Sequence, residues 1–160
     1  MTISVGDRMP EGSFGQMTGD GPGSISNDEL FSGKKVVLFA VPGAFTPTCS
    51  MSHLPGYVEH AGEILAKGID TIACMSVNDV FVMDAWGKDR DTGDKVLMLA
   101  DGNGDYTQAL GLGLDASGFG MGQRSQRFAI VIDDGVVAQL HVEAPGEFKV
   151  SAADSVLAAL

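Results

Sequence analysis

The feature that most constrains the fold is a short apolar run, KKVVLFAV (34–41), which ends abruptly in the turn-forming segment PGAFTPTCS (42–50). This run is rich in β-branched side chains and lacks the alternation of a half-exposed strand, so it predicts a strand buried on both faces of a sheet. After the turn, apolar residues recur at three- and four-residue intervals, which predicts a helix: Leu54, Tyr57, Val58, Ala61, Ile64 and Leu65. A doubly buried strand of this kind requires helices on both faces of its sheet.

The rest of the chain repeats this alternation of strand and helix. Apolar, β-rich runs predict strands at 70–77 and 95–101, and helices are expected at 78–89, 104–112 and 151–160. The segment 125–143 contains two β-rich runs around Asp134 and Gly135, which predicts an antiparallel hairpin. The region 11–30 is dense in Gly, Ser and Asp and is typical of loops and short hairpins, and 118–123 is expected to be a Gly-rich loop. This order indicates an α/β, thioredoxin-like fold: a central mixed β-sheet flanked by helices, with N-terminal additions.

Two local signals refine the helices. Pro55 and Gly56 fall inside the first apolar helical pattern, so we expect a kink or break there, and Gly68 is expected to end that helix. Asn78 or Asp79 is expected to cap the second helix at its N-terminus.

The bulk composition limits the possible partners and compartments. A chain of 160 residues predicts one domain, residues 1–160, and its formal charge of −11 disfavours nucleic acid and anionic membranes as partners. The N-terminal residues show no secretory signal, and no apolar run approaches the ~18 residues of a membrane span. The only cysteines, Cys49 and Cys74, match neither a disulfide scaffold nor a zinc site. We therefore expect a cytoplasmic location, no metal and no cofactor.

Cys49 stands where a nucleophilic cysteine is expected. Thr46 is a suitable N-cap residue and Pro47 a suitable first helical residue, which places Cys49 in the first turn of the helix. Unpaired amides and the helix dipole at that position favour a thiolate over a thiol. Two plainer interpretations stay open from position alone: Cys49 as a buried, inert thiol, and Thr46 as a helix cap only.

The same segment carries a family resemblance. Pro42, Thr46 and Cys49 form the pattern Pro-x-x-x-Thr-x-x-Cys, which resembles the signature of peroxiredoxins. Three longer runs, FAVPGAFTPTCSMSHLPGYVE, SVNDVFVMDAWGK and RSQRFAIVIDDG, are similar to type-II, or type-five-like, peroxiredoxins of plants and bacteria that couple to glutaredoxin or thioredoxin. The similarity covers nearly the whole chain. It implies a thiol-dependent peroxidase that reduces hydrogen peroxide and small alkyl hydroperoxides, and subgroup members commonly form homodimers.

The resemblance also assigns roles to residues. Cys49 is implied as the cysteine that attacks the peroxide, Thr46 as the residue that orients it, and Pro42 as a shield against water. Arg127 matches the family's arginine, and the period of a strand places it on one face with Ala129 and Val131. Phe45 and Phe119 are weaker candidates for an apolar peroxide pocket.

Two nearby side chains, those of Arg124 and His53, receive supporting interpretations. Arg124 lies three residues before Arg127, an odd spacing that places the two side chains on opposite faces of a strand. We therefore expect Arg124 to form a supporting ion pair or a surface contact. His53 lies four residues after Cys49, on the same helix face. A thiolate already stabilised by a helix and an arginine needs no base, so we expect a structural or modest tuning role for His53.

The step that regenerates Cys49 is less determined by the sequence. Some relatives carry a second cysteine near the C-terminus, but the matching stretch GEFKVSAADSV has none. Cys74 is therefore a possible resolving thiol or an inert buried one. We expect an external thiol, glutathione with glutaredoxin or thioredoxin, to reduce the Cys49 sulfenic acid. The alternative function is a redox sensor or chaperone-like protein in which oxidation of Cys49 switches partner binding.

Overall fold

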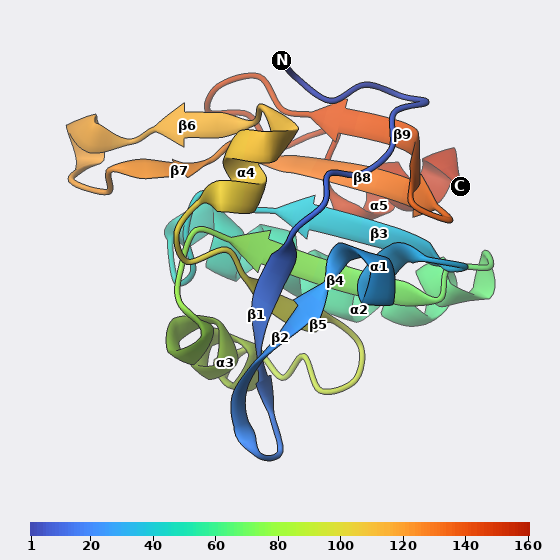
Figure 1. Ribbon diagram of the computed structural model, residues 1–160, viewed down its shortest axis with the longest axis horizontal. Coiled ribbons are helices and arrows are strands. Elements are labelled where there is room, and N and C mark those ends of the chain that lie inside the picture. The colour runs from blue at the N-terminus through green and yellow to red at the C-terminus, as the bar shows by residue number, and fades with distance from the viewer.

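The computed structural model describes residues 1–160 and contains a seven-stranded mixed sheet with the order β2-β1-β5-β4-β3-β8-β9. The three central neighbours β3, β4 and β5 run parallel, and the outer pairs are antiparallel. The strands of this sheet are β1 (Ser13–Thr18), β2 (Gly21–Ser26), β3 (Lys35–Ala40), β4 (Thr71–Ser76), β5 (Leu97–Ala100), β8 (Phe128–Asp133) and β9 (Val136–Val142). In Figure 1 the carboxyl ends of β3 and β4 point to the same side of the molecule.

The expected burial of β3 on both faces is confirmed. Residues 36–40 are completely buried, and alternate side chains enter two different hydrophobic cores. Val37 and Phe39 join one core, whereas Val36 and Leu38 join the other. A shift of one residue in the register of β3 would exchange these two sets, so the two cores together fix its pairing.

Helices cover both faces of the sheet. Figure 1 shows α2 (Leu54–Ala66) and α5 (Ala153–Ala159) behind it, and α1 (Asn27–Phe31) and α4 (Asp105–Leu110) in front. The remaining helix, α3 (Val80–Asp89), contributes Met83 and Trp86 to the same core as α2 and α5. None of the helices combines the length and the apolarity that crossing a bilayer demands.

Most expected elements form, with one correction. The Gly-rich stretch 118–123 is largely a loop, as expected: it connects β6 (Gly113–Asp115) to β7 (Gln123–Ser125) and includes part of the 3₁₀ turn η2 (Ser117–Phe119). These two short strands, which pair in a small antiparallel sheet, were not expected from the sequence. The correction is that the helix does not break at Pro55 and Gly56. A π-helical turn, η1 (Cys49–His53), precedes α2, and Pro55 lies in the first turn of α2. The helical run begins at Pro47 and is continuous through η1 into α2, and the π-helical turn lies just before Pro55, whose missing N–H interrupts the regular hydrogen bonding.

The local caps follow the expected chemistry. The Asp79 carboxylate accepts a hydrogen bond of 2.8 Å from the Val82 amide and caps α3, whereas Asn78 does not. Asp134 and Gly135 both have positive φ angles, 49° and 78°, as a two-residue hairpin turn between β8 and β9 requires. The β3–α2–β4 unit, the β8–β9 hairpin and α5 make the thioredoxin-like core, and β1, β2 and α1 are the N-terminal additions.

Candidate active site

The turn after β3 is held in place by the end of β4. The Val41 amide donates to the Met75 carbonyl at 3.2 Å, and the Ala44 amide donates to the Asn78 side chain at 3.0 Å. Phe45 adopts a positive φ of 63°, which is a strained conformation for a bulky residue. The turn is therefore fixed by contacts just before the strained residue, and it delivers the chain directly to the helix that follows.

The helix begins at Pro47, as predicted, but Thr46 does not cap it with its hydroxyl. The Thr46 carbonyl accepts the first helical hydrogen bond from the Ser50 amide at 2.8 Å, while the Thr46 hydroxyl donates to the Gly43 carbonyl at 2.7 Å. The prediction that the Thr46 hydroxyl caps the helix was wrong, because the strained turn brings the Gly43 carbonyl within hydrogen-bonding distance of that hydroxyl. The amides of residues 48 and 49 have no acceptor within the chain, so the first turn keeps free donors beside the sulfur.

Cys49 and Arg127 lie side by side although 78 residues separate them. Arg127 Nη2 donates to Cys49 Sγ at 3.0 Å, and Cys49 is completely buried. Arg127 stands immediately before β8, and Ala129 and Val131 share the core that contains Cys49. A half-buried guanidinium needs an acceptor to offset its lost hydration, and the sulfur is one.

His53 is the second partner of the Arg127 guanidinium. Its Nδ1 lies 2.8 Å from Arg127 Nη1, and its Nε2 lies 3.1 Å from the Ser151 carbonyl oxygen. A carbonyl can only accept and a guanidinium can only donate, so we assign the ring proton to Nε2. Burial, and then the positive charge of Arg127, lower the pKa of His53 to about 3. His53 is therefore neutral at physiological pH and accepts from Arg127.

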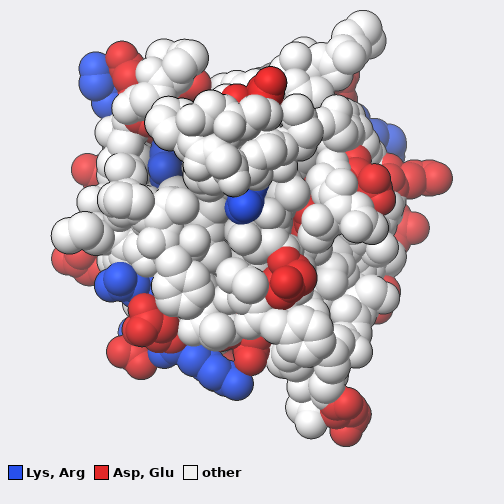
Figure 2. All heavy atoms as spheres, turned by 90° about the vertical axis from the view of Figure 1, so that its left-hand side faces the viewer, with Lys and Arg blue, Asp and Glu red and all other residues white.

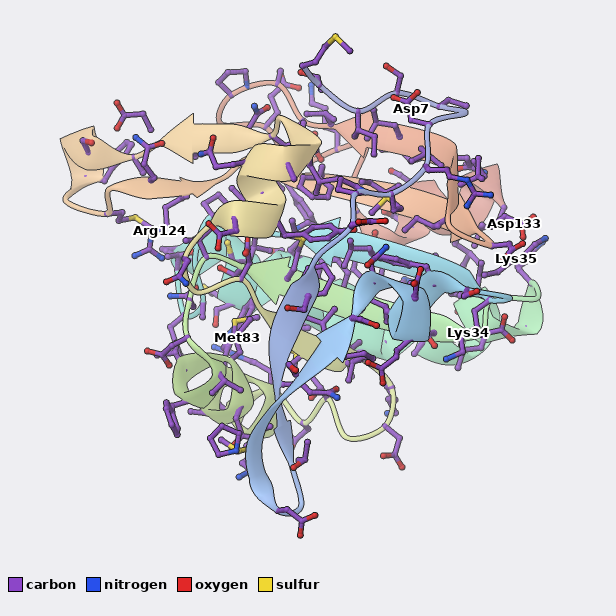
Figure 3. The ribbon with its side chains drawn as sticks, in the orientation of Figure 1. Asp7, Lys34, Lys35, Met83, Arg124 and Asp133 are labelled. Atoms are coloured by element: carbon purple, nitrogen blue, oxygen red, sulfur yellow. The ribbon has the colours of Figure 1, made fainter.

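Arg124 lies in β7, whereas Arg127 stands just before β8. The expectation that the two arginines lie on opposite faces assumed one common strand, which the structure does not have. The Nε of Arg124 donates to the Met121 carbonyl at 2.8 Å and its Nη1 to the Val77 carbonyl at 3.2 Å. Figure 3 shows Arg124 near the carboxyl end of β4, far from the exposed pair of Lys35 and Asp133. It ties the β6–β7 hairpin to the β4–α3 loop.

A cavity of about 590 Å³ opens beside the guanidinium. Its lining includes Arg127, Pro42 and Phe119, but neither Phe45 nor Thr46. Phe45 is half exposed and faces Trp86, with ring centroids 6.4 Å apart. Figure 2 views the molecule from the side on which β3 and β4 end, and there basic atoms sit within recesses of a largely uncharged surface. Sequence reasoning missed the remaining lining residues, which come from four separate segments: Thr48, Leu114, Gln126, Glu143, Ala144, Pro145, Gly146 and Glu147.

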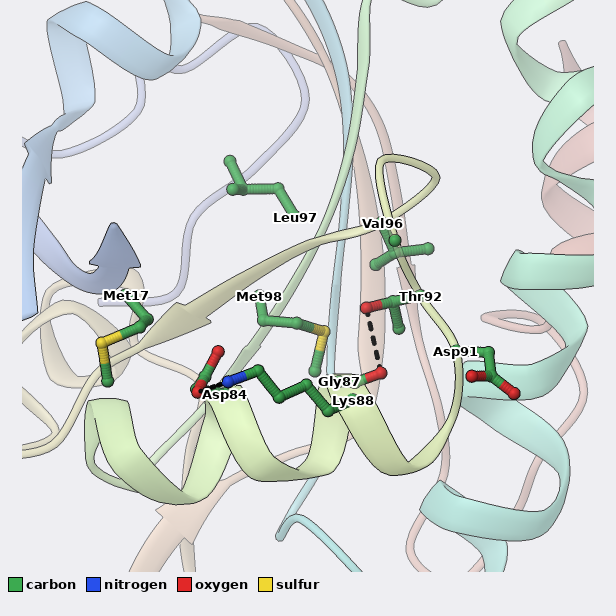
Figure 4. A pocket seen from close by; sticks show the side chains of 10 residues that line it. Met17, Asp84, Gly87, Lys88, Asp91, Thr92, Val96, Leu97 and Met98 are labelled. Atoms are coloured by element: carbon green, nitrogen blue, oxygen red, sulfur yellow. Dashed lines mark hydrogen bonds and ion pairs between the residues drawn. The ribbon is translucent and has the colours of Figure 1, made fainter. Parts of the chain in front are cut away.

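A second cavity, of about 520 Å³, lies between α3 and β5. Figure 4 shows the ion pair of Lys88 with Asp84, 2.9 Å apart, and the hydrogen bond from the Thr92 hydroxyl to the Gly87 carbonyl. No cysteine or histidine lines this cavity. Elsewhere in the chain, no group of three or more His, Cys, Asp or Glu side chains is arranged to hold a metal ion.

Cys74 and Trp86 complete the surroundings of Cys49. Cys74 lies in β4 opposite Phe39 of β3, is completely buried and is unpaired, as is Cys49. Burial, and then the negative charge of an ionised Cys49, raise the pKa of the Cys74 thiol well above its usual range. Trp86 Nε1 donates to the Ser50 hydroxyl at 2.8 Å and so anchors the turn that carries Cys49.

Comparisons with known proteins show the family of the chain. A family model described as Redoxin matches residues 4–157. Peroxiredoxin-2B of Arabidopsis thaliana is 52% identical over 159 residues, 99% of this chain and 98% of that protein. The chloroplastic peroxiredoxin-2E of the same plant is 51% identical over 99% of this chain and 70% of its own length. The crystal structure of reduced Prx3 from Vibrio vulnificus in complex with H2O2 superposes with a TM-score of 0.95, at 54% identity and 99% coverage of both chains.

A buried cysteine at the start of a helix, paired with an arginine on a thioredoxin-like sheet, defines a redoxin that acts through a thiol. Within that class, the chain belongs to the peroxiredoxins of the type-II, or type-five-like, subgroup. Its activity is that of a thiol-dependent peroxidase.

Proposed function

We propose that Cys49 is the nucleophile of this peroxidase and that Arg127 holds its sulfur as the anion. The observation that carries the proposal is the 3.0 Å contact between Arg127 Nη2 and Cys49 Sγ inside a buried site. Free amides of the first helical turn add partial positive charge on the helix side of the sulfur. Two sources of positive charge in a low-dielectric setting favour the thiolate, the reactive form of cysteine.

The chemical step transfers one hydroxyl group. The thiolate donates an electron pair to the terminal oxygen of the hydroperoxide, the O–O bond breaks, and Cys49 becomes a sulfenic acid. The leaving alkoxide or hydroxide takes a proton from solvent and departs as an alcohol or water. Arg127 and the free amide of Cys49 are placed to stabilise the charge that develops on the leaving oxygen.

Two further residues of the turn complete the proposed site. Thr46 presents its hydroxyl oxygen as an acceptor for the peroxide O–H, because its own proton is donated to Gly43. Pro42 lines the cavity and offers no N–H there, which keeps that wall free of competing donors. The cavity of about 590 Å³ beside Arg127 is large enough to admit hydrogen peroxide and small alkyl hydroperoxides; Phe119 lies at its wall, whereas Cys49 and Thr46 do not line it.

We propose a one-cysteine mechanism with an external reductant. Cys74 is completely buried, its raised pKa keeps it protonated, and residues 146–156 contain no cysteine. The sulfenic acid then condenses with glutathione to a mixed disulfide and water, and glutaredoxin takes the glutathionyl group and restores the Cys49 thiolate. Thioredoxin is the other candidate. Because Cys49 has no exposed surface, its turn must move before a protein thiol can attack.

Steady-state turnover with each reductant tests this mechanism. Cys49→Ser should abolish the consumption of peroxide, whereas Cys74→Ser should keep it, with glutathione and glutaredoxin or with thioredoxin as the electron source. Loss of turnover in the folded Cys74→Ser protein would contradict the one-cysteine mechanism. A wild-type protein that stops after one equivalent of peroxide, with every reductant, would instead fit the redox-sensor alternative.

The role of Arg127 is tested in the peroxide step alone. Arg127→Ala should slow oxidation of the reduced protein by about 10²–10³-fold, the cost typical of removing one donor that stabilises developing charge. Arg90→Ala is the matched control, because Arg90 pairs only with its neighbour Asp89 at 3.4 Å. Equal rates for the two variants would remove Arg127 from the chemistry.

We also propose a homodimer, a cytoplasmic location and a single domain over residues 1–160. Phe45, Phe81 and Phe119 are exposed by 50%, 63% and 86%, and large apolar side chains on a surface favour association. Two unpaired cysteines suit a reducing compartment. Sedimentation of the wild type and of Phe81→Glu tests the dimer: one species of dimer mass for the wild type and a monomer for the variant are expected.

A further inference from the structure

The last residue of the β8–β9 hairpin region carries a carboxylate that the chemistry above does not use. Glu143 directly follows β9, is only 7% exposed, and its amide donates to the Arg127 carbonyl at 3.0 Å. Its Oε2 accepts hydrogen bonds from the Lys149 amide at 2.7 Å, from the Ser151 amide at 2.9 Å and from the Ser151 hydroxyl at 2.6 Å. Its Oε1 accepts from the Val150 amide at 3.3 Å. We call Glu143 together with residues 149–151 the carboxylate brace.

The carboxylate brace continues without interruption to the nucleophile. The carbonyl of Ser151, a residue of the brace, accepts hydrogen bonds from His53 Nε2 at 3.1 Å and from the Tyr57 hydroxyl at 2.7 Å. Nδ1 of His53 then accepts from Arg127 Nη1 at 2.8 Å, and Arg127 Nη2 reaches Cys49 Sγ at 3.0 Å. Each link fixes the donor and acceptor roles of the next, because a carbonyl only accepts and a guanidinium only donates.

Arg127 depends on this path for its orientation. No carboxylate pairs with the guanidinium; its other neighbour is the Phe148 ring, whose centroid lies 5.8 Å from Arg127 Cζ. A stacked ring fixes the plane of the guanidinium only loosely, whereas a hydrogen bond to one nitrogen fixes which nitrogen faces the sulfur. His53 is thus the partner that selects Nη2 for Cys49.

We propose that Glu143 is a positioning residue for the peroxidase reaction: it fixes the Ser151 carbonyl, which sets the tautomer of His53, which in turn aims Arg127 at Cys49. The inference rests on the proposed role of Arg127. Burial by itself would raise the pKa of Glu143, but hydrogen bonds from the Ser151 hydroxyl and from the amides of residues 149–151 outweigh it and lower the pKa. The carboxylate therefore stays ionised at neutral pH and accepts all four bonds.

The test measures the peroxide step in a single turnover. Trp86 is the only tryptophan and is hydrogen-bonded to the residue after Cys49, so its fluorescence during rapid mixing with hydrogen peroxide follows Cys49 oxidation. Glu143→Ala should slow this step by about ten- to a hundredfold, the cost of misplacing a reacting group by around 1 Å. Glu143→Gln should recover a rate within about threefold of the wild type, because its amide oxygen can still accept at the Oε2 position.

A second buried carboxylate serves as the matched control. Asp101 is 5% exposed and accepts from the Tyr106 amide, the Thr107 amide and the Thr107 hydroxyl, at 3.1, 2.8 and 2.7 Å. Asp101→Ala should lower thermal stability as Glu143→Ala does, yet leave the rate per folded molecule within about twofold of the wild type. Equal slowing by the two alanine variants would reduce Glu143 to a structural role and overturn the inference.

A double-mutant cycle separates this inference from the role of Arg127. In an Arg127→Ala background, Glu143→Ala should cause no further slowing, because the brace acts only through the guanidinium. If Arg127→Ala slows the step and folded Glu143→Ala does not, the brace is refuted and the role of Arg127 stands. If Arg127→Ala itself has no effect, both are refuted. Should Glu143→Ala not fold, Glu143→Asp, one methylene shorter, should show the same fall in rate, and an unchanged rate would refute the brace.

Discussion

Lowering the pH from 7 to 5 should destabilise this protein by about 2 kcal/mol through His53 alone. The pKa of His53 is lowered from 6.5 to about 3 by burial and by the charge of Arg127. Below pH 6.5 the unfolded chain binds a proton at this ring and the folded chain does not, so stability is complete above 6.5 and is lost as the pH falls towards 3. Each pH unit in that window costs about 1.4 kcal/mol, which gives about 2 kcal/mol between pH 7 and pH 5.

Urea denaturation at the two pH values measures this loss. In a parallel thermal melt, about 2 kcal/mol corresponds to a fall of roughly 4–8 °C in Tm for a chain of this size. His53→Gln removes this ring, so its stability, although lower at pH 7, should fall by clearly less than that of the wild type between pH 7 and pH 5. The remaining fall comes from His141, whose pKa burial also lowers. His60→Gln is the control: His60 lies on the same helix with a partly exposed side chain, hydrogen-bonded to Glu63 at 3.1 Å. The pKa of the Glu143 carboxylate is lowered from 4.5, so this group stays ionised between pH 7 and pH 5. The reasoning fails if His53→Gln loses as much stability as the wild type.

Three substitutions test the packing around the site by urea denaturation at pH 7. Ser50→Ala leaves the buried Trp86 Nε1 without its 2.8 Å acceptor and should cost about 1–3 kcal/mol; no change would show that the ring finds another partner. Asp79→Ala removes the acceptor that caps the Val82 amide and should cost about 1 kcal/mol of stability, whereas Asp79→Asn keeps a capping oxygen and should cost much less. Leu54→Ala, at a completely buried position, should cost about 2–5 kcal/mol of stability. A loss below about 1 kcal/mol would show that the core collapses into the space left by the leucine side chain.

The regular elements could be predicted because their signals are local. The β3 strand is apolar from Val36 to Ala40, and the structure uses both of its faces, in two cores. The Asp134–Gly135 turn and the Asp79 cap likewise depend on residues within a few positions of each other. The 118–123 segment is the expected loop, but the strands that flank it, β6 and β7, have only three residues each and are too short to leave a periodic signal in the sequence.

The candidate site was only half visible in the sequence. The position of Cys49 at a helix start follows from local signals, and the side of β8 on which Arg127 lies follows from strand periodicity. The direction of the Thr46 hydroxyl could not be predicted, because its hydrogen bond to the Gly43 carbonyl depends on the strained backbone conformation of Phe45. Glu143 gave no signal either, since its effect on the site passes through Ser151, which lies 98 residues from His53.

The separation of Cys49 from Arg127 along the chain has a consequence during synthesis. The two residues lie 78 positions apart, so at about 5–20 residues per second roughly 4–16 s pass between their emergence in translation. If Arg127 holds the sulfur as the anion, the nascent thiol lacks its activating cation throughout that interval. The newborn polypeptide therefore carries an ordinary, slowly oxidised cysteine, and its sensitivity to oxidants appears only when the last strands have joined the sheet.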